Sequence, residues 1–222
     1  MYSHSYYRSR ESWPDFRLEA DALLRLARLC PAARVLEVGC GSGGLLRRMG
    51  QRARLAVGVD LSWEGLSLAR DRVGGSKELG AGAGFVLRAR AESLPFANGA
   101  FDAVVAQHLL EHLPDPVQAL QEWRRVLCPE GILVLITPNA SYPDGDLFHD
   151  PDHINLFTPA SLRTALEDAG FRVTHLATLF PYLGRHRLAR SASIRLGRLQ
   201  LGLRLPGLGN GRSLLAAATP SI

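Results

Sequence analysis

Apolar residues along the chain follow two alternating spacings. Residues 15–29 place Leu18, Ala22, Leu26 and Leu29 at helical intervals, which predicts an amphipathic helix. Elsewhere the apolar residues form short runs rich in β-branched side chains, which predict strands. These runs are Arg34–Val38, Leu55–Asp60, Phe85–Arg88, Asp102–Gln107, Gly131–Thr137, Phe171–Thr178 and Ser213–Thr219.

Helices are predicted between most of these runs. Two begin near Leu45 and Trp63, a third is opened by Asp115-Pro116, and a fourth runs from Thr158-Pro159 to Gly170. Alternating strands and helices predict an α/β fold with a mostly parallel, doubly wound sheet. Ligands then bind at the carboxyl ends of the strands, where the loop after the first strand marks the topological switch point.

The last predicted strand follows the glycine-rich turn 206–211 without a crossover helix. Such a strand pairs antiparallel with its neighbour. We therefore expect one domain over residues 1–222, because this length supports one compact core. Its expected parts are a helical N-terminal cap (1–30), a core (31–180), an arginine-rich insert (181–212) and the last strand (213–219).

The composition narrows the class of protein. The first residues contain no apolar run typical of a signal peptide, and no segment is apolar enough to span a bilayer. The three cysteines follow no metal-ligand spacing. These features predict a cytoplasmic location, with membrane-peripheral attachment as the alternative.

Charge is distributed unevenly. The net charge is +5, yet no Asp or Glu follows Asp168, while arginines are frequent there. Residues 185–205 also carry an apolar stripe at helical spacing. Its members are Leu188, Ala192, Leu196, Leu199 and Leu203. We weigh three interpretations: packing of the stripe over the sheet, peripheral membrane contact, and binding of another anionic partner; nucleic acid is the least favoured.

The loop after the first strand, Val35 to Gly44, fits two templates. Its G-x-G-x-x-G spacing is typical of a dinucleotide-binding turn, in which backbone amides receive a pyrophosphate. The second template is E-x-G-x-G-x-G, which begins at Glu37, two residues before the first glycine. The Glu37 carboxylate would repel a pyrophosphate and attract a cation. Asp60 ends the next strand, where an acid can accept ribose hydroxyls in either template.

Five ordered blocks extend this second template and resemble the class I S-adenosylmethionine-dependent methyltransferases, particularly the ubiquinone and menaquinone branch. They are VLEVGCGSG (35–43), VGVDLS (57–62), RAESLPFANGAFDAVVAQHLLEHLPDP (90–116), RVLCPEGILVLITPN (125–139) and LFTPASLRTALEDAGF (156–171). The resemblance implies a Rossmann-like, seven-stranded sheet with a reversed last strand and S-adenosylmethionine as cofactor.

The resemblance also implies roles for individual residues. Those expected at the cofactor are Glu37, Gly39, Gly41 and Gly43 at the methionine part, Asp60 at the ribose, Leu61, Ala91 and Glu92 at the adenine, and Gln107 at the reacting methyl. Arg90 departs from the pattern, because this branch carries an Asp there that accepts a bond from the adenine amino group. Arginine cannot accept one, so we expect that contact to be made elsewhere or to be weaker.

Methyl transfer from a sulfonium needs positioning, and a base if the acceptor must lose a proton. The histidines near the predicted acceptor side are candidates for the base: His153, His108 and His149. His112, with Glu111, is expected to cap the turn after the fourth strand. A second hypothesis groups His108, Glu111, His112 and His153 as ligands of a divalent metal, since the first three lie at i, i+3 and i+4. It is the less favoured of the two.

The expected function is methyl transfer to a small-molecule or lipid-linked acceptor, at oxygen rather than at nitrogen or carbon. Two rivals of other classes remain. A nicotinamide-dependent oxidoreductase is opposed by Glu37 and by the lack of a Tyr-x-x-x-Lys pair. A non-catalytic cofactor-binding domain is the other rival.

Overall fold

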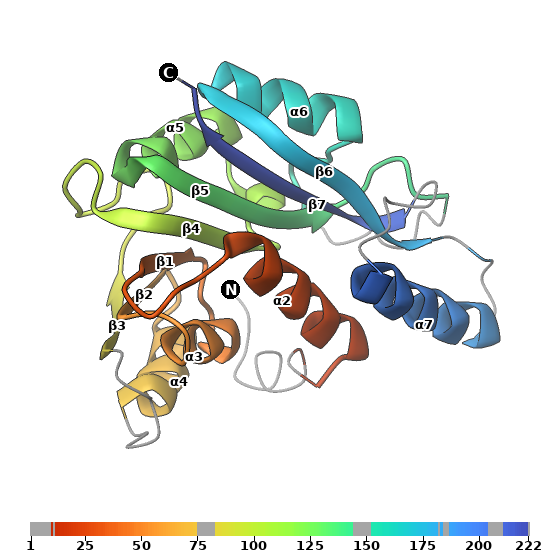
Figure 1. Cartoon of the computed structure of the whole chain (residues 1–222), viewed down its shortest axis with the longest axis horizontal. Coiled ribbons are helices and arrows are strands. Elements are labelled where there is room, and N and C mark those ends of the chain that lie inside the picture. Colours follow the sequence, from red (N-terminus) through yellow and green to blue (C-terminus); the bar gives the residue numbers. More distant parts are fainter. Residues whose placement is uncertain are drawn as a thin grey trace.

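A computed structural model describes residues 10, 12–74, 83–143, 152–181, 183, 187–203 and 211–221. Within these residues one sheet is covered by helices on both faces (Figure 1). The elements in chain order are α2 (Pro14–Ala27), β1 (Arg34–Val38), α3 (Gly44–Gly50), β2 (Leu55–Asp60), α4 (Trp63–Gly74), β3 (Ala83–Arg88), β4 (Phe101–Gln107), the 3₁₀ turn η1 (Leu110–His112), α5 (Pro116–Val126), β5 (Leu127–Pro138), α6 (Pro159–Asp168), β6 (Phe171–Pro181), α7 (Arg187–Leu203) and β7 (Gly211–Pro220).

The sheet confirms the predicted fold class. Its seven described strands lie in the order β3-β2-β1-β4-β5-β7-β6. β1 pairs in parallel with both β2 and β4, and β7 is antiparallel to both β5 and β6. The chain therefore reverses direction across the sheet at β1, so that the β1–α3 loop lies at the switch point.

The two faces of the sheet form two hydrophobic cores. Val104 and Ala106 of β4 pack on the side of α5 and α6, whereas Ala103 and Val105 pack on the side of α2, α3 and α4. This alternation follows from the two-residue period of a strand. The central strands are consequently buried on both faces. This packing holds their carboxyl ends, which carry the site, in place.

Helix starts agree with the capping signals in the sequence. The Asp115 side chain accepts a hydrogen bond from the Gln118 amide at 2.9 Å, and Thr158 forms a reciprocal capping box with Ser161. Gly170 has a φ of +82° just past the end of α6, where a side chain would be strained. β5 begins at Leu127, before the predicted Gly131, because Pro129 and Glu130 interrupt the apolar pattern without ending the strand.

The helical spacing in the arginine-rich segment is confirmed by α7. Two leucines of the apolar stripe, however, face solvent and do not pack against the sheet. Leu188 is 85% exposed and Leu199 is 53% exposed. Ser193, Gly197 and Gln200 are buried instead. A Cβ on Gly197 would lie 2.8 Å from Phe180, so this glycine allows α7 to approach β6 closely and sets which side of the helix faces inward. Helical periodicity alone could not identify that side. Among the described residues, no helix combines the length and apolarity needed to cross a membrane.

Candidate active site

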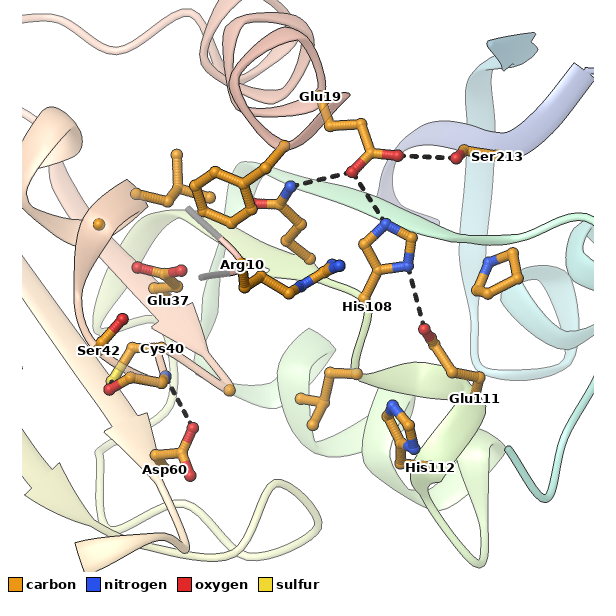
Figure 2. A pocket seen from close by; sticks show the side chains of 18 of the residues that line it. Arg10, Glu19, Glu37, Cys40, Ser42, Asp60, His108, Glu111, His112 and Ser213 are labelled. Atoms are coloured by element: carbon orange, nitrogen blue, oxygen red, sulfur yellow. Dashed lines mark hydrogen bonds and ion pairs between the residues drawn. The ribbon is translucent and has the colours of Figure 1, made fainter. Parts of the chain in front are cut away.

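A cavity of about 630 Å³ opens at the carboxyl ends of β1, β2 and β4 (Figure 2). Its described lining comes from α2 and the chain before it, the β1–α3 loop, the end of β2, the segment from Gln107 to Leu113, His153, and the start of β7. This volume suits a drug-sized ligand. The cavity therefore lies where the topology predicts a ligand site.

The glycines of the β1–α3 loop serve two different purposes. Gly39 and Gly41 line the cavity with φ of +74° and +49°, and a Cβ on Gly39 would come within 3.0 Å of Leu109. Gly43 is not in the described lining; its φ is +79°, and a Cβ there would approach Ala69 of α4 to 2.9 Å. Gly43 therefore allows α3 and α4 to pack, and its expected contact with the cofactor stays a prediction. Gly44 lines the cavity in its place.

Two carboxylates lie beside this loop. Glu37 is only 3% exposed and lines the cavity. Asp60 accepts hydrogen bonds from the Gly41 and Ser62 amides, each at 2.8 Å, so its carboxylate is held at the cavity wall. Burial, together with the charges of Glu37 and Asp60, raises the pKa of the Cys40 thiol well above its usual value. The loop therefore presents negative charge, where a pyrophosphate would meet repulsion.

The residues expected at the adenine are divided by the structure. Leu61 lines the cavity and is partly exposed. Ala91 and Glu92 are absent from the described lining: the Ala91 carbonyl accepts a bond from the Trp123 indole at 3.0 Å, and Glu92 pairs with Arg90 at 3.4 Å. Arg90 points outward, with 62% of its side chain exposed. The expected contacts of Ala91 and Glu92 are therefore not supported by the shape of this cavity.

Gln107 lines the cavity with one acceptor that has no partner. Its Nε2 donates to Glu19 of α2 at 3.2 Å, which fixes the orientation of the amide because a carboxylate only accepts. Its Oε1 is buried and has no hydrogen-bond partner in the structure as described. A buried acceptor without a hydrogen bond costs free energy unless a bound ligand donates a hydrogen bond to it. Gln107 Oε1 could therefore accept a hydrogen bond from a ligand in the cavity, and the expected place of Gln107 at the reacting methyl stays a prediction.

His108 forms the centre of a buried charge network that links α2 to the end of β4 (Figure 2). Its Nε2 lies 2.9 Å from Glu19 and its Nδ1 lies 3.2 Å from Glu111. The same two carboxylates accept bonds from Ser213 at 2.7 Å and from Thr137 at 2.9 Å. The network thus joins α2, β4, η1, β5 and β7.

The charges in this network determine its protonation. Burial alone would lower the pKa of His108, but the charge of Glu19 and hydrogen bonds to Glu111 and Glu19 outweigh it and raise the pKa to about 9. Burial would raise the pKa values of Glu19 and Glu111, yet the charge and hydrogen bonds of His108 hold both below their usual range. His108 is therefore protonated at neutral pH, which opposes its expected role as a base.

Glu19 is the residue that the sequence analysis missed. It lies one helical turn before the buried Leu23, on the packed side of α2. An acid on the packed side of a helix is rarely buried without a partner, so its position in the sequence already indicated a buried polar contact. The partner could not be named in advance, since His108 follows 89 residues later.

His112 and His153 also line the cavity. The Nδ1 of His112 donates to the Asp152 carbonyl at 2.9 Å, and the rings of His112 and His153 are 4.9 Å apart. His112 therefore anchors the segment after β5 as well as ending η1. His149 lies outside the described residues.

The four-residue metal hypothesis needs a correction. One ligand atom each from Glu111, His112 and His153 lie within 4.8 Å of one another, but His108 does not belong to this group. The 3₁₀ turn begins only at Leu110, and His108 has a φ of +53°, so the expected helical turn does not form. Both ring nitrogens of His108 already contact carboxylates. A divalent metal at the other three residues stays a prediction.

Known proteins resemble this chain in sequence and in fold. A model of the methyltransferase domain family matches residues 36–135. A ubiquinone biosynthesis O-methyltransferase from Xanthomonas axonopodis is 31% identical, over 76% of this chain and 76% of that protein. The chain belongs to the class I S-adenosylmethionine-dependent methyltransferases.

Other relatives agree with this assignment. A probable S-adenosylmethionine-dependent methyltransferase from Mycolicibacterium smegmatis is 30% identical over 74% of this chain. The matched region spans only 62% of the length of that relative. The solved structure of such a methyltransferase from Aquifex aeolicus has a TM-score of 0.70 and 19% identity, covering 99% of this chain and 100% of that one, and it supports the fold. S-adenosylmethionine is thereby confirmed as the cofactor of the family to which this chain belongs.

The residues that line the cavity fit that cofactor. The buried Glu37 carboxylate and the unfilled Oε1 of Gln107 suit an ammonium, and Asp60 suits the ribose hydroxyls. Arg10 also lines the cavity, with its guanidinium 5.4 Å from the Trp13 ring centre, and it suits a carboxylate. The cavity thus offers groups of both signs for a zwitterionic ligand.

Proposed function

We propose that this protein methylates a hydroxyl group of a small-molecule or lipid-linked acceptor, with S-adenosylmethionine as donor. The observation that carries the proposal is the buried Glu37 carboxylate at the glycine loop of a 630 Å³ cavity. It suits a cationic cofactor and disfavours NAD, whose pyrophosphate would meet the same carboxylate. The O-methyltransferase among the relatives supports oxygen over nitrogen or carbon as the methylated atom.

The proposal divides the site into two walls. Glu37, Gly39, Gly41, Asp60 and Gln107 would hold the donor, which supplies an already activated methyl group. The opposite wall contains His153 and His112, and there the acceptor hydroxyl would have to lose its proton. The chain then contributes orientation, exclusion of water and one proton acceptor.

His153 is the base in this proposal. His108 is protonated and both of its ring nitrogens contact carboxylates, whereas His153 lines the cavity beside His112 on the side proposed for the acceptor. A neutral imidazole can accept the hydroxyl proton as the oxygen bonds to the methyl group. The proton leaves with the base and no other co-reactant is needed.

Replacing His153 with asparagine (H153N) is expected to lower the rate of methyl transfer by roughly 100-fold or more, the usual contribution of a general base. The assay is transfer from methyl-labelled S-adenosylmethionine to fractionated cell extract, with identification of the labelled product. The affinity for S-adenosylhomocysteine should not change. H175N is the matched control, because His175 lies half-buried on β6 outside the cavity lining. If H153N labels the acceptor as fast as the wild type, His153 is not the base. An acceptor labelled at nitrogen or carbon would refute methylation at oxygen.

A further inference from the structure

We propose that one face of α7 binds a membrane surface containing anionic lipid. The face comprises Leu188, Ser191, Arg195, Arg198 and Leu199, and we call it the outer face of α7. The proposal goes beyond methyl transfer and does not depend on it.

All five residues of the outer face are exposed and point to the same side. At 3.6 residues per turn, positions 188, 191, 195, 198 and 199 fall within an arc of about 100°. Leu188 and Leu199 lie toward one edge of this arc, and Arg198 toward the other. An exposed surface that combines leucine and arginine in this way is typical of helices that lie in a membrane interface.

The opposite side of α7 accounts for its attachment to the protein. Ser193, Gly197 and Gln200 are buried, and the Gln200 side chain donates to the Thr178 carbonyl at 3.0 Å. Gly197 is the point of closest approach, against Phe180. The leucines of the outer face are therefore not needed to hold the helix on β6. An external partner explains their exposure better than packing does.

Charge indicates the kind of partner. No Asp or Glu occurs from Ala169 to the end of the sequence, while this stretch holds eight arginines. No carboxylate of the segment can therefore neutralise Arg195 and Arg198. A surface of anionic headgroups complements them, and the leucines can enter the region below the headgroups. A nucleic acid would pair with the arginines but would leave the leucines in water.

The position of α7 makes such contact useful. It packs beside α2, on the same side of the sheet (Figure 1). Asp15, Phe16 and Glu19 of α2 line the cavity. Binding through the outer face would bring the cavity close to a bilayer, where a lipid-linked acceptor is located.

Flotation of the full chain with lipid vesicles tests the proposal. We expect binding to phosphatidylcholine vesicles that contain phosphatidylglycerol, much weaker binding to pure phosphatidylcholine, and weakening as salt increases. The variant R195Q/R198Q should lower partitioning by roughly 25-fold, since each arginine near an anionic surface contributes about fivefold. L188S/L199S should lower it by about tenfold or more.

The matched control is R54Q/R70Q, which removes the same charge from two exposed arginines outside α7. It should bind vesicles like the wild type, and all variants should unfold at the same temperature because the altered side chains are exposed. Failure to float with anionic vesicles at low salt would overturn the proposal. So would an equal loss in R54Q/R70Q, or binding to RNA at a salt concentration at which vesicles are not bound.

Discussion

The E37Q variant is expected to bind S-adenosylhomocysteine roughly 100-fold more weakly than the wild type, a loss of about 3 kcal/mol. Glutamine keeps the shape of Glu37 but removes the charge that suits the ligand ammonium in a buried setting. Isothermal titration calorimetry measures the change directly. The unliganded variant should keep the fold of the wild type, because glutamine occupies the same volume as glutamate.

An analogue of S-adenosylhomocysteine that lacks the α-amino group sharpens this test. It should bind wild type and E37Q with equal affinity, since the charge pair is absent in both cases. E130Q is the matched control, because Glu130 is exposed on β5 and lies outside the cavity lining. An equal loss of affinity for both compounds in E37Q would mean that Glu37 shapes the loop and does not contact the ammonium.

The second large effect is expected from E19Q, which should lower the free energy of unfolding by roughly 3 kcal/mol or more. The change removes one partner of a buried ion pair and leaves His108 without its main counter-charge. Urea denaturation near neutral pH measures the loss. The double variant E19Q/H108Q should recover part of it, because neither charge is then buried alone.

The same pair predicts how stability depends on pH. The folded-state pKa of His108, about 9, lies above its ordinary value of 6.5. Its contribution is therefore complete below about pH 6.5 and disappears as the pH rises through about 9. The lowered pKa values of Glu19 and Glu111 act in the opposite direction, so their contribution disappears as the pH falls below their ordinary value of 4.5.

Comparison of urea midpoints at about pH 6 and about pH 9 tests this expectation. The wild type should be on the order of 3 kcal/mol less stable at the higher pH, and H108Q should lose most of that difference. H175Q is the control, since burial lowers the pKa of His175 and gives it no stabilising charge in this range. An unchanged pH dependence in H108Q would show that the pair does not titrate as described.

The features that the sequence predicted are those set by local physics. Strand and helix periods and the helix starts at Asp115 and Thr158 depend on only a few neighbouring residues. The antiparallel direction of β7 was also predicted and is confirmed, although α7 lies between β6 and β7 in the chain. Glu37 and Asp60 could be placed because each follows from its position at the end of a strand.

The features that were missed depend on packing between distant segments. Glu19 meets His108 only after α2 has docked on the sheet, and that contact turns a candidate base into a fixed cation. Gly43 and Gly44 differ in role because α4 approaches one of them. The exposed side of α7 follows from the contact of Gly197 with Phe180, which no spacing of leucines reveals.

Thermal unfolding of the purified chain with S-adenosylmethionine, S-adenosylhomocysteine or NAD tests the central claim most directly. The claim is that the glycine loop accepts a cationic cofactor because Glu37 is buried beside it. Both adenosyl compounds should stabilise the protein, by about 2.7 kcal/mol when present at about 100 times Kd, and NAD should have no effect. Stabilisation by NAD without stabilisation by S-adenosylhomocysteine would contradict the account.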